Sequence, residues 1–526
     1  MAGWSGPVIV DLDDLPHGSL LQADVCIVGG GIAGLLLAHA LLDSQSQILL
    51  LESGGLGDEQ ATQALTDAEI SGWPYKATRD GRFRVLGGAS TRWGGQLLPL
   101  TPNDFARRPH VPGSGWPIDG TALEPYLQRI EALMGVNHLP YDDRLSTVLQ
   151  HAAPPPPESS AWQLRYSKWA PFAKRNLAQS LGAGLARHPR VRVVLHANVT
   201  SLDRDDLGQI TALQARSLGG RCCTAEARQL VLCCGTVETV RLLLATATTD
   251  RQAIGNHSGL LGRYFHDHLS LPITQMSGAA RAFALRSFAP WYRGGTRHSL
   301  KLETNSQWQR RQGCLGTMAH LVFSSPEGSA IAWARQHLQG RQCPQPGPAP
   351  SVPWRSLLRD GADLLELSLR RAVQRRRWSP RAADVHLTLD CEQAPSPLSC
   401  ITLSDRCNSL GEPLAKVSWH WGEHEHHTIE QVAALLDRQW RRWGLGRLSL
   451  PPNWQASIHD TLHPMGGTRM SHEPGQGVVD ASLRVHGTSN LYLASCSVFP
   501  TGGSSNPTLT LMALCLRLAD HLRSAS

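Results

Sequence analysis

The sequence predicts an α/β domain with a parallel sheet, assembled from separated segments, with a second domain inserted between them. Three observations predict this fold. Near its N-terminus the chain holds a strand–helix–strand unit of about 30 residues, 24–52, which implies a parallel sheet. A second strand-rich region spans 191–235 and leads into a helix. After about residue 455 the sequence returns to glycine turns, short strands and a final amphipathic helix, 507–523.

A glycine motif follows the first strand of the N-terminal unit. The apolar run 24–28 indicates a buried strand, and a helix is expected over 35–42. Between them, Gly29, Gly31 and Gly34 fit the pattern G-x-G-x-x-G. In this pattern the first glycine allows the tight turn, the second lets a pyrophosphate approach the backbone, and the third lets the helix pack against the strand. The pyrophosphate then meets free N–H groups at the positive end of the helix.

Glu52 follows the second strand, 48–51, where a carboxylate can accept hydrogen bonds from ribose hydroxyls. The glycine hexapeptide alone is weak evidence. With the strand, the helix and Glu52 at the right distances, a dinucleotide site is a far better interpretation than a glycine turn without a ligand. The strand–helix–strand unit does not show whether the bound dinucleotide is FAD or NAD, although its position at the start of a 526-residue chain favours FAD.

The middle of the chain differs in composition from both ends. It is rich in Trp, Arg and Pro, with helix-like patterns at 328–338 and 355–378 and a proline-rich loop or linker at 344–353. No internal repeat is evident. The simplest division is a nucleotide-binding domain at 1–274, an inserted domain at 275–454, and a C-terminal return to the first domain at 455–526.

Composition excludes several classes of protein. The net charge of +7 is small for this length, and the one basic run, 370–377, is better explained as a solvated helix face than as a nucleic-acid site. No stretch reaches the roughly 18 apolar residues of a membrane span, and residues 1–21 lack the pattern of a signal peptide. The 12 cysteines lack zinc-site spacing, so reduced thiols and a soluble, cytoplasmic protein are expected.

Four blocks of short motifs carry a family resemblance that spans nearly the whole chain. At this point the sequence resembles the glucose–methanol–choline (GMC) oxidoreductases. The most specific block is the C-terminal one, whose order of motifs is similar to the branch of pyranose oxidases and bacterial sugar and gluconate dehydrogenases. The region 275–390 matches little, and substrate specificity is expected there. The four blocks are 24–55; 86–95 with 115–118 and 123–126; 232–242 with 262–268; and 463–470 through 505–510.

The resemblance implies a Rossmann-like FAD-binding domain with an inserted substrate domain built on an antiparallel sheet. It also implies oxidation of a CH–OH group, in a sugar, polyol or related alcohol, by hydride transfer to flavin N5. No metal is expected. The residues expected to bind FAD are Gly29, Gly31, Gly34, Glu52, Arg92, Trp93, Gly94, Val199, Pro507 and Thr508.

The family places a histidine and a second histidine or asparagine over the reacting atom, and here those positions are His463 and Asn506. An imidazole suits the base because its unperturbed pKa, roughly 6.5, leaves it mostly neutral at pH 7. Asn506 cannot act as a base, but it can hydrogen-bond and orient the substrate oxygen. Pro507 starts the last helix, whose positive end would stabilise the anionic reduced flavin.

Arg92 departs from a pattern within the family. Pyranose oxidases carry a covalently attached histidine in a Ser-Thr-His-Trp motif, and this chain has Ser-Thr-Arg-Trp at 90–93. Arginine cannot form that bond, so the resemblance and this departure together imply noncovalent FAD. We expect the loss of the covalent link to lower the flavin potential and to narrow the range of electron acceptors.

Several residues leave alternatives open. Glu392 and Gln393 could reach a polar substrate, or they could be structural. His268 fits a family position that is more often structural than catalytic. The histidine-rich run 419–427 resembles a metal cluster, but its histidines do not share one helical face, so a surface junction between a strand and a helix is preferred.

Two rival functions remain at this stage. One is oxidation of a non-sugar alcohol, such as a biosynthetic intermediate. The other is a flavoprotein that acts as a scaffold without catalysis, against which the intact His463 and Asn506 argue. The expected partners are a small alcohol or sugar and an electron acceptor, which is oxygen, a quinone or a redox protein.

Overall fold

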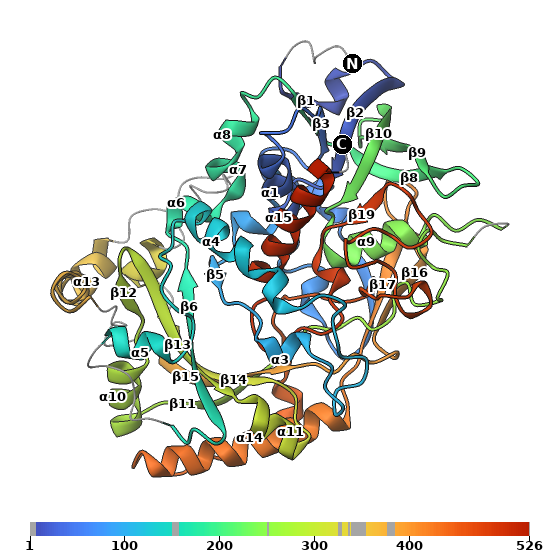
Figure 1. Ribbon diagram of the computed structural model, residues 1–526. Helices are drawn as coiled ribbons and strands as arrows, with labels where there is room; N and C mark the ends of the chain where they lie inside the picture. The colour runs from blue at the N-terminus through green and yellow to red at the C-terminus, as the bar shows by residue number, and fades with distance from the viewer. Residues whose placement is uncertain are drawn as a thin grey trace.

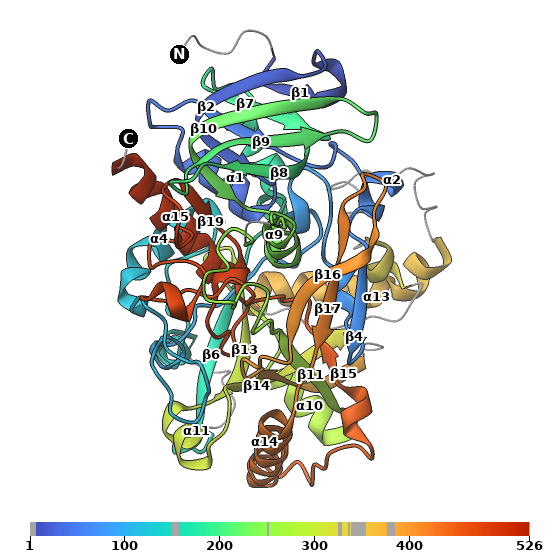
Figure 2. The ribbon, with the colours of Figure 1, turned by 90° about the vertical axis from the view of Figure 1, so that its right-hand side faces the viewer.

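The computed structural model describes residues 7–149, 157–249, 252–324, 329–334, 337, 354–375 and 384–524. The loop predicted at 344–353 lies outside these residues, as do parts of the helix-like patterns at 328–338 and 355–378. Figures 1 and 2 show two large sheets, one at the top of the molecule and one in its lower half. Within the described residues, no helix is both long enough and apolar enough to cross a bilayer.

The first sheet joins the strands of the predicted nucleotide-binding domain. Its order is β1-β7-β3-β2-β10-β9-β8, and β19 pairs with the end of β10. Neighbours among β1, β7, β3, β2, β10 and β19 pair in parallel, so their carboxyl ends meet at one edge. The predicted Rossmann-like sheet is therefore confirmed. The strands are β1 (Ile9–Asp11), β2 (Ser19–Val28), β3 (Ile48–Leu51), β7 (Val191–Leu195), β8 (Asn198–Arg204), β9 (Ile210–Arg216), β10 (Cys222–Leu232) and β19 (Leu491–Leu493).

Two helices far apart in the sequence pack together beside this sheet. They are α1 (Ile32–Ala40) and α15 (Thr508–Ser524), which lie side by side in Figure 1. Helix α1 begins three residues before its predicted start, because Gly31 already serves as its N-cap. The apolar residues of both helices join the core of the first sheet, where β3 is buried along its whole length.

The second sheet is antiparallel, as predicted for the substrate domain. Its order is β18-β11-β15-β14-β13-β6-β5, with β12 paired to β13. One face is apolar: Leu300, Leu302, Leu387 and Leu389 join a second core that also holds residues of α14 (Glu423–Arg442). Figure 1 shows α14 beneath this sheet. The strands are β5 (Gln96–Leu97), β6 (Trp162–Trp169), β11 (His268–Gln275), β12 (Trp291–Arg293), β13 (Thr296–Thr304), β14 (Thr317–Ser324), β15 (Asp384–Glu392) and β18 (His459–Asp460).

The strands of the second sheet do not follow the predicted segment boundaries at 274/275 and 454/455. Strands β5, β6 and most of β11 come from before residue 275, and β18 comes after residue 454. Apolar alternation identifies a strand but not the sheet that it joins. The two sheets are therefore interleaved along the chain, and a single insertion is too simple a description.

A small third sheet, β16-β17-β4, links distant segments at the side of the molecule in Figure 2. It contains β4 (Ala68–Gly72), β16 (Cys400–Cys407) and β17 (Pro413–Trp419). The histidine-rich run begins at the end of β17, and α14 begins at Glu423. In this run His424 and His427 contact the backbone carbonyls of residues 313 and 312. The run is the predicted junction between a strand and a helix.

Candidate active site

A cavity lies at the carboxyl edge of the first sheet. Its wall is formed by the ends of β2, β3 and β10, by the segment 81–84, by the start of α9 (Gly235–Leu244), and by the C-terminal segments 462–464, 494–496 and 507–511. This is the edge at which parallel α/β sheets bind their ligands. Seven residues predicted from the sequence line it: Gly29, Gly31, Glu52, Val199, His463, Pro507 and Thr508.

The three motif glycines have distinct surroundings. Gly29 has a φ of +103°, and a Cβ there would lie 2.7 Å from the Cys233 carbonyl oxygen. A Cβ on Gly34 would lie 1.9 Å from the Gly29 carbonyl oxygen, so only glycine lets α1 pack this close. A Cβ on Gly31 would meet nothing within 4 Å. Gly31 therefore borders open space at the start of a helix, which suits a diphosphate.

Glu52 is buried at the end of β3 and faces the cavity. Its Oε2 accepts a hydrogen bond from the Gly30 amide at 2.6 Å, and its Oε1 accepts one from the Gly54 amide at 2.8 Å. Burial raises the pKa of this carboxyl, and the two amide donors oppose that shift. Oε1 also accepts the Ser53 hydroxyl at 3.3 Å, whereas Oε2 keeps a further lone pair. Glu52 therefore shapes the glycine loop and can still accept a ribose hydroxyl.

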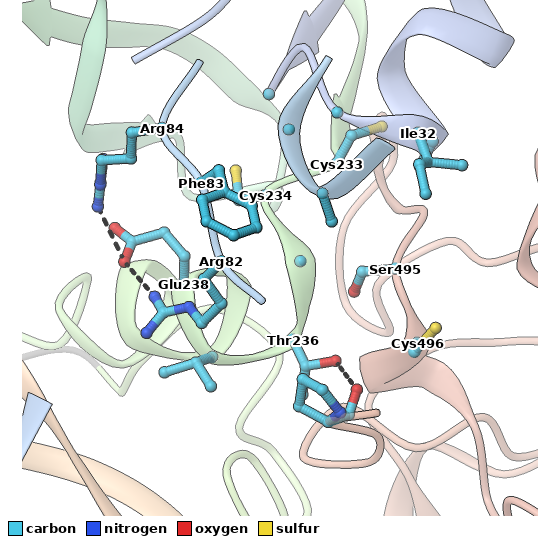
Figure 3. A pocket seen from close by; sticks show the side chains of 18 of the residues that line it. Ile32, Arg82, Phe83, Arg84, Cys233, Cys234, Thr236, Glu238, Ser495 and Cys496 are labelled. Carbon is cyan, nitrogen blue, oxygen red and sulfur yellow. Dashed lines mark hydrogen bonds and ion pairs between the residues drawn. The ribbon is translucent and has the colours of Figure 1, made fainter. Parts of the chain in front are cut away.

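An ion-pair cluster forms one side of the cavity (Figure 3). Glu238 on α9 lies 3.3 Å from the Arg84 guanidinium and 3.7 Å from that of Arg82. These cations, with Arg241, hold the pKa of Glu238 well below its usual range against the effect of burial. The Thr236 hydroxyl donates to the Pro464 carbonyl at 2.6 Å. Helix α9 is thereby tied to the loop that carries His463.

His463 follows β18 in a tightly held loop. Its neighbour Leu462 has a φ of +62°, in the left-handed region that leucine rarely adopts. The His463 amide donates to Asp267 Oδ2 at 2.9 Å. The Nε2 atom of its ring lies 3.2 Å from the Asn506 side-chain nitrogen, which donates to it. Asn506 itself is not among the residues lining the cavity, but this contact brings the two predicted catalytic residues together.

The hydrogen-bond partners of His463 determine its tautomer. His268 Nε2 lies 2.9 Å from the Gly503 carbonyl oxygen, so it carries the proton, and Nδ1 of neutral His268 is an acceptor. His268 Nδ1 lies 3.1 Å from His463 Nδ1, which must then be the donor. The Thr461 hydroxyl donates to Asp267 at 2.9 Å and accepts from His463 Nδ1 at 2.7 Å. Both constraints place the His463 proton on Nδ1 and leave a lone pair on Nε2.

Burial sets the protonation states of this cluster. It lowers the pKa of His463 to about 3, with a smaller contribution from His268, whose own pKa is also lowered by burial. Both rings are therefore neutral at pH 7. Burial, together with Asp460, raises the pKa of Asp267 to about 7. The site thus holds a neutral imidazole with an available nitrogen, as a general base requires.

Asp267, His268 and His463 also place one potential metal-ligand atom each within 4.8 Å of one another. Every one of these groups already has a protein partner. Asp267 accepts hydrogen bonds from the Tyr75 and Thr461 hydroxyls, and both histidine rings are engaged as described above. The chemistry of the cluster therefore favours a hydrogen-bond network over an ion site.

Glu392 and Gln393 hold the site together through protein contacts. Glu392 forms a bidentate ion pair with Arg108, at 2.7 and 2.6 Å, and accepts the Gly503 amide at 3.1 Å. Gln393 Oε1 accepts from the Asp267 amide at 2.9 Å, and its Nε2 donates to the His420 carbonyl at 2.6 Å. Because these polar atoms are satisfied inside the protein, the tentative substrate role gives way to the structural one. Sequence patterns cannot reveal this, because Arg108 and Glu392 are 284 positions apart.

Arg92, Trp93 and Gly94 are not among the residues that line the cavity. Arg92 forms an ion pair with Asp58 and lies over the Phe83 ring, 4.3 Å from its centroid. Phe83 does line the cavity, so Arg92 lies behind the wall. The Trp93 indole donates to the Arg175 carbonyl at 2.8 Å. A Cβ on Gly94 would lie 2.8 Å from the Trp169 ring.

Three residues of the site were not proposed from the sequence as functional: Asp267, His268 and Thr461. The His-Asp-His run at 266–268 is the available signal, and the sequence favours a structural over a catalytic role for His268. Their part in the site depends on β11 and β18 lying side by side, which the alternation of residues along either strand does not reveal.

Comparisons with known proteins agree with this geometry. A family model described as FAD dependent oxidoreductase matches residues 24–286, and one described as GMC oxidoreductase matches residues 395–515. The chain is 23% identical to the fructose dehydrogenase large subunit of Gluconobacter japonicus, with 95% of this chain and 98% of that protein covered. It is 23% identical to the paromamine 6'-oxidase of Streptomyces fradiae, with 94% and 90% covered.

Solved structures share the fold. Pyridoxine 4-oxidase from Mesorbium loti superimposes with a TM-score of 0.54 at 18% identity, over 95% of this chain and 98% of that one. The R554K variant of Aspergillus oryzae RIB40 formate oxidase, solved to follow FAD modification, gives a TM-score of 0.56 at 16% identity, over 97% and 99%.

Proposed function

The chain belongs to the GMC family of FAD-dependent oxidoreductases, and we propose that it oxidises the CH–OH group of a sugar, polyol or related alcohol with His463 as the base. The single observation that carries this proposal is the set of hydrogen-bond partners around the His463 ring, from which its tautomer follows. Its Nδ1 proton is held by Thr461 and His268, while Nε2 keeps its lone pair beside Asn506.

The cavity fits the FAD that the family requires. Gly31 leaves open space at the start of α1 for the diphosphate, and Glu52 faces the place where a ribose would lie. Pro507 and Thr508, where α15 begins, line the same cavity as His463. The positive end of this helix favours negative charge there. When bound, FAD supplies the acceptor for the substrate hydride.

The chain's own residues then handle the substrate and its proton. His463 Nε2 takes the hydroxyl proton, and the imidazolium that forms keeps its Nδ1 hydrogen bonds to Thr461 and His268. The Asn506 side chain turns its N–H from His463 to the substrate oxygen and holds it in place. Asp267 orients the loop by accepting from the Thr461 hydroxyl and the His463 amide.

The proposal is tested by the reductive half-reaction. Purified protein is mixed anaerobically with a panel of sugars, polyols and simple alcohols, and the oxidised flavin band is followed. We expect at least one sugar or polyol to bleach it. If simple alcohols alone bleach the band, the non-sugar alternative is correct. If no alcohol does so, the protein is the non-catalytic flavoprotein of the second alternative.

We further propose that FAD is bound without a covalent link. The supporting observation is that Arg92, at the position of the covalent histidine in pyranose oxidases, is engaged by Asp58 and Phe83 behind the cavity wall. Acid precipitation of the pure protein is expected to release all of the yellow flavin into the supernatant. Flavin that remains in the pellet contradicts this, and Arg92→His tests whether the position alone restores attachment.

Glu52 gives a prediction for cofactor affinity. Glu52→Gln keeps the size of the side chain but removes the charge that accepts two amide hydrogen bonds and would accept one from a ribose hydroxyl. We expect FAD binding to weaken by about 1.5–3 kcal/mol, the usual contribution of a charge-assisted hydrogen bond. The measurement is FAD occupancy after extended dialysis. Glu226→Gln, a change at a half-buried position on β10 of the same sheet, away from the cavity, serves as the control and should retain FAD.

The electron acceptor and the location remain proposals. Oxygen, a quinone and a redox protein are the three candidates for the acceptor. They are distinguished by the rate at which each reoxidises the reduced protein in stopped flow.

A cytoplasmic location is proposed from the many cysteines, of which the eleven in the described residues are free thiols.

A further inference from the structure

Lys301 on β13 is a buried residue whose side-chain amine has no hydrogen-bond or ion-pair partner among the described residues. The residue is 5% exposed, and no hydrogen bond or ion pair joins its Nζ to the part of the chain that the structure describes. Burial lowers the pKa of this amine, while Asp390 and Glu303 act in the opposite direction. An ammonium without hydrogen-bond partners is costly inside a protein, so a residue kept in this state points to a ligand.

Lys301 lies on the face of the second sheet that bears the active site. Side chains alternate between the faces of a strand, so Lys301 shares its face with Glu303. Glu303 accepts a hydrogen bond from the Ser504 hydroxyl at 2.6 Å, and Ser504 is two residues before Asn506. The Lys301 charge also contributes to lowering the pKa of His463. Lys301 is therefore directed to the side of the sheet where the proposed chemistry occurs.

A second strand of the sheet, β15, separated from β13 by β14, supports the same placement. Asp390 on β15 shares a face with Glu392, which pairs across the sheet with His268 and accepts the Gly503 amide. The His268 ring contacts His463 at 3.1 Å. Asp390 interacts with Lys301 electrostatically, which joins the lysine to this part of the site.

The two carboxylates near Lys301 are already paired with other groups. Glu303 forms an ion pair with Arg165 at 2.7 Å, and Asp390 lies 2.7 Å from His320. They moderate the charge of the lysine without taking its hydrogen bonds. The three N–H donors of an ammonium thus remain available for acceptors that the described chain does not supply.

We propose that the Lys301 ammonium forms a substrate subsite that binds a second oxygen of the substrate, a hydroxyl or a carboxylate other than the reacting hydroxyl. This subsite rests on the proposed function and narrows it. Polyols, sugars and hydroxy acids satisfy the buried donors, whereas a monohydric alcohol leaves them unpaired. A substrate with an ammonium group at this place is rejected by like charge.

The test combines substitutions of the Lys301 side chain with substrate analogues that lack one oxygen. The substrates are the best polyol or sugar acid of the panel and its deoxy analogues, each lacking one non-reacting oxygen. Anaerobic flavin reduction gives the substrate Kd and the limiting rate for wild type, Lys301→Met and Lys301→Arg. Lys416→Met, an exposed change on β17, is the control and should behave as wild type.

For Lys301→Met we expect the Kd of the full substrate to rise by about 10- to 100-fold, with little change in the limiting rate. One deoxy analogue should bind wild type as weakly as the variant binds the full substrate, and the variant should not distinguish the two. Lys301→Arg should restore part of the affinity. Because Met removes an unpaired buried charge, the variant should retain FAD and keep or raise the wild-type melting temperature.

The outcomes separate this subsite from the function on which it rests. Suppose that polyols bleach the flavin band of the wild type, but Lys301→Met raises the Kd of every substrate and analogue by the same factor, or of none. The subsite is then wrong and the proposed function stands. If the limiting rate falls and the Kd does not change, Lys301 acts on the chemistry and not on binding, which also overturns the proposal. If no alcohol bleaches wild type, the proposed function fails and the subsite fails with it.

Discussion

Replacing His463 with alanine should slow anaerobic flavin reduction by about 10²–10⁴-fold, the usual contribution of general-base catalysis. FAD should remain bound, because Gly31 and Glu52 are unchanged. The rate should fall because Nε2 of His463 is the nitrogen with an available lone pair at the predicted reaction site. Stopped-flow reduction with a panel substrate gives the rate, and the flavin spectrum confirms that the cofactor is present.

Asn506→Ala is the comparison for this variant. It should also lose rate, but by less, because it removes a group that orients the oxygen and leaves the base in place. A near-normal rate in His463→Ala would place the base elsewhere, with His268 or His472 next to test.

A base with the pKa of an unperturbed histidine would make the reduction rate fall as the pH drops through about 6.5. Burial lowers the pKa of His463 to about 3, so this ring stays deprotonated throughout pH 5 to 9.

The second large effect concerns Asp267, which influences through Thr461 which nitrogen of His463 carries the proton. Above its pKa of about 7, the carboxylate accepts the Thr461 hydroxyl, and Thr461 accepts from His463 Nδ1. A protonated Asp267 can donate to Thr461, whose hydroxyl then turns to His463 Nδ1 and favours the tautomer with its proton on Nε2. The reduction rate should therefore be full above pH 7 and fall as the pH drops through about 7.

Asp267→Asn should remain in a low-activity state at every pH, because an amide keeps the shape of the carboxyl group but removes the titrating charge that accepts the Thr461 hydroxyl. We expect reduction to slow on the order of 10²-fold, with a flat profile between pH 5 and 9, since a base held in the wrong tautomer loses most of its effect. The measurement is the limiting rate of flavin reduction across that range.

Thr461→Val is the matched control for Asp267→Asn, because it removes the hydroxyl link and leaves the carboxylate. His463 Nδ1 keeps its contact with His268, so this variant should reduce flavin at an intermediate rate without the fall near pH 7. A wild-type profile with no inflection near pH 7, or the same inflection in Asp267→Asn, would assign the control of His463 to another group.

The sequence by itself predicted the glycine loop and Glu52 of the cofactor half, whereas Arg92, Trp93 and Gly94, also predicted there, do not line the cavity. Gly29 and Gly34 were assigned from a six-residue pattern, and the structure places them where a Cβ would collide with backbone atoms. Glu52 was predicted at the end of the second strand, and it lies there and lines the cavity. Such positions can be predicted from the sequence because they depend on nearby residues. A turn, the start of a helix and the end of a strand are all set within about 30 residues.

The active-site chemistry required the tertiary structure. His463 and Asn506 could be named from motifs, but the state of the imidazole depends on Asp267, which is 196 positions away. Glu392 and Lys301 are both buried charged residues that the sequence could not tell apart in role. The first is neutralised by Arg108, and the second has no such partner among the described residues. Which charges are paired depends on which strands become neighbours in the sheet, and residue types along a single strand do not specify that.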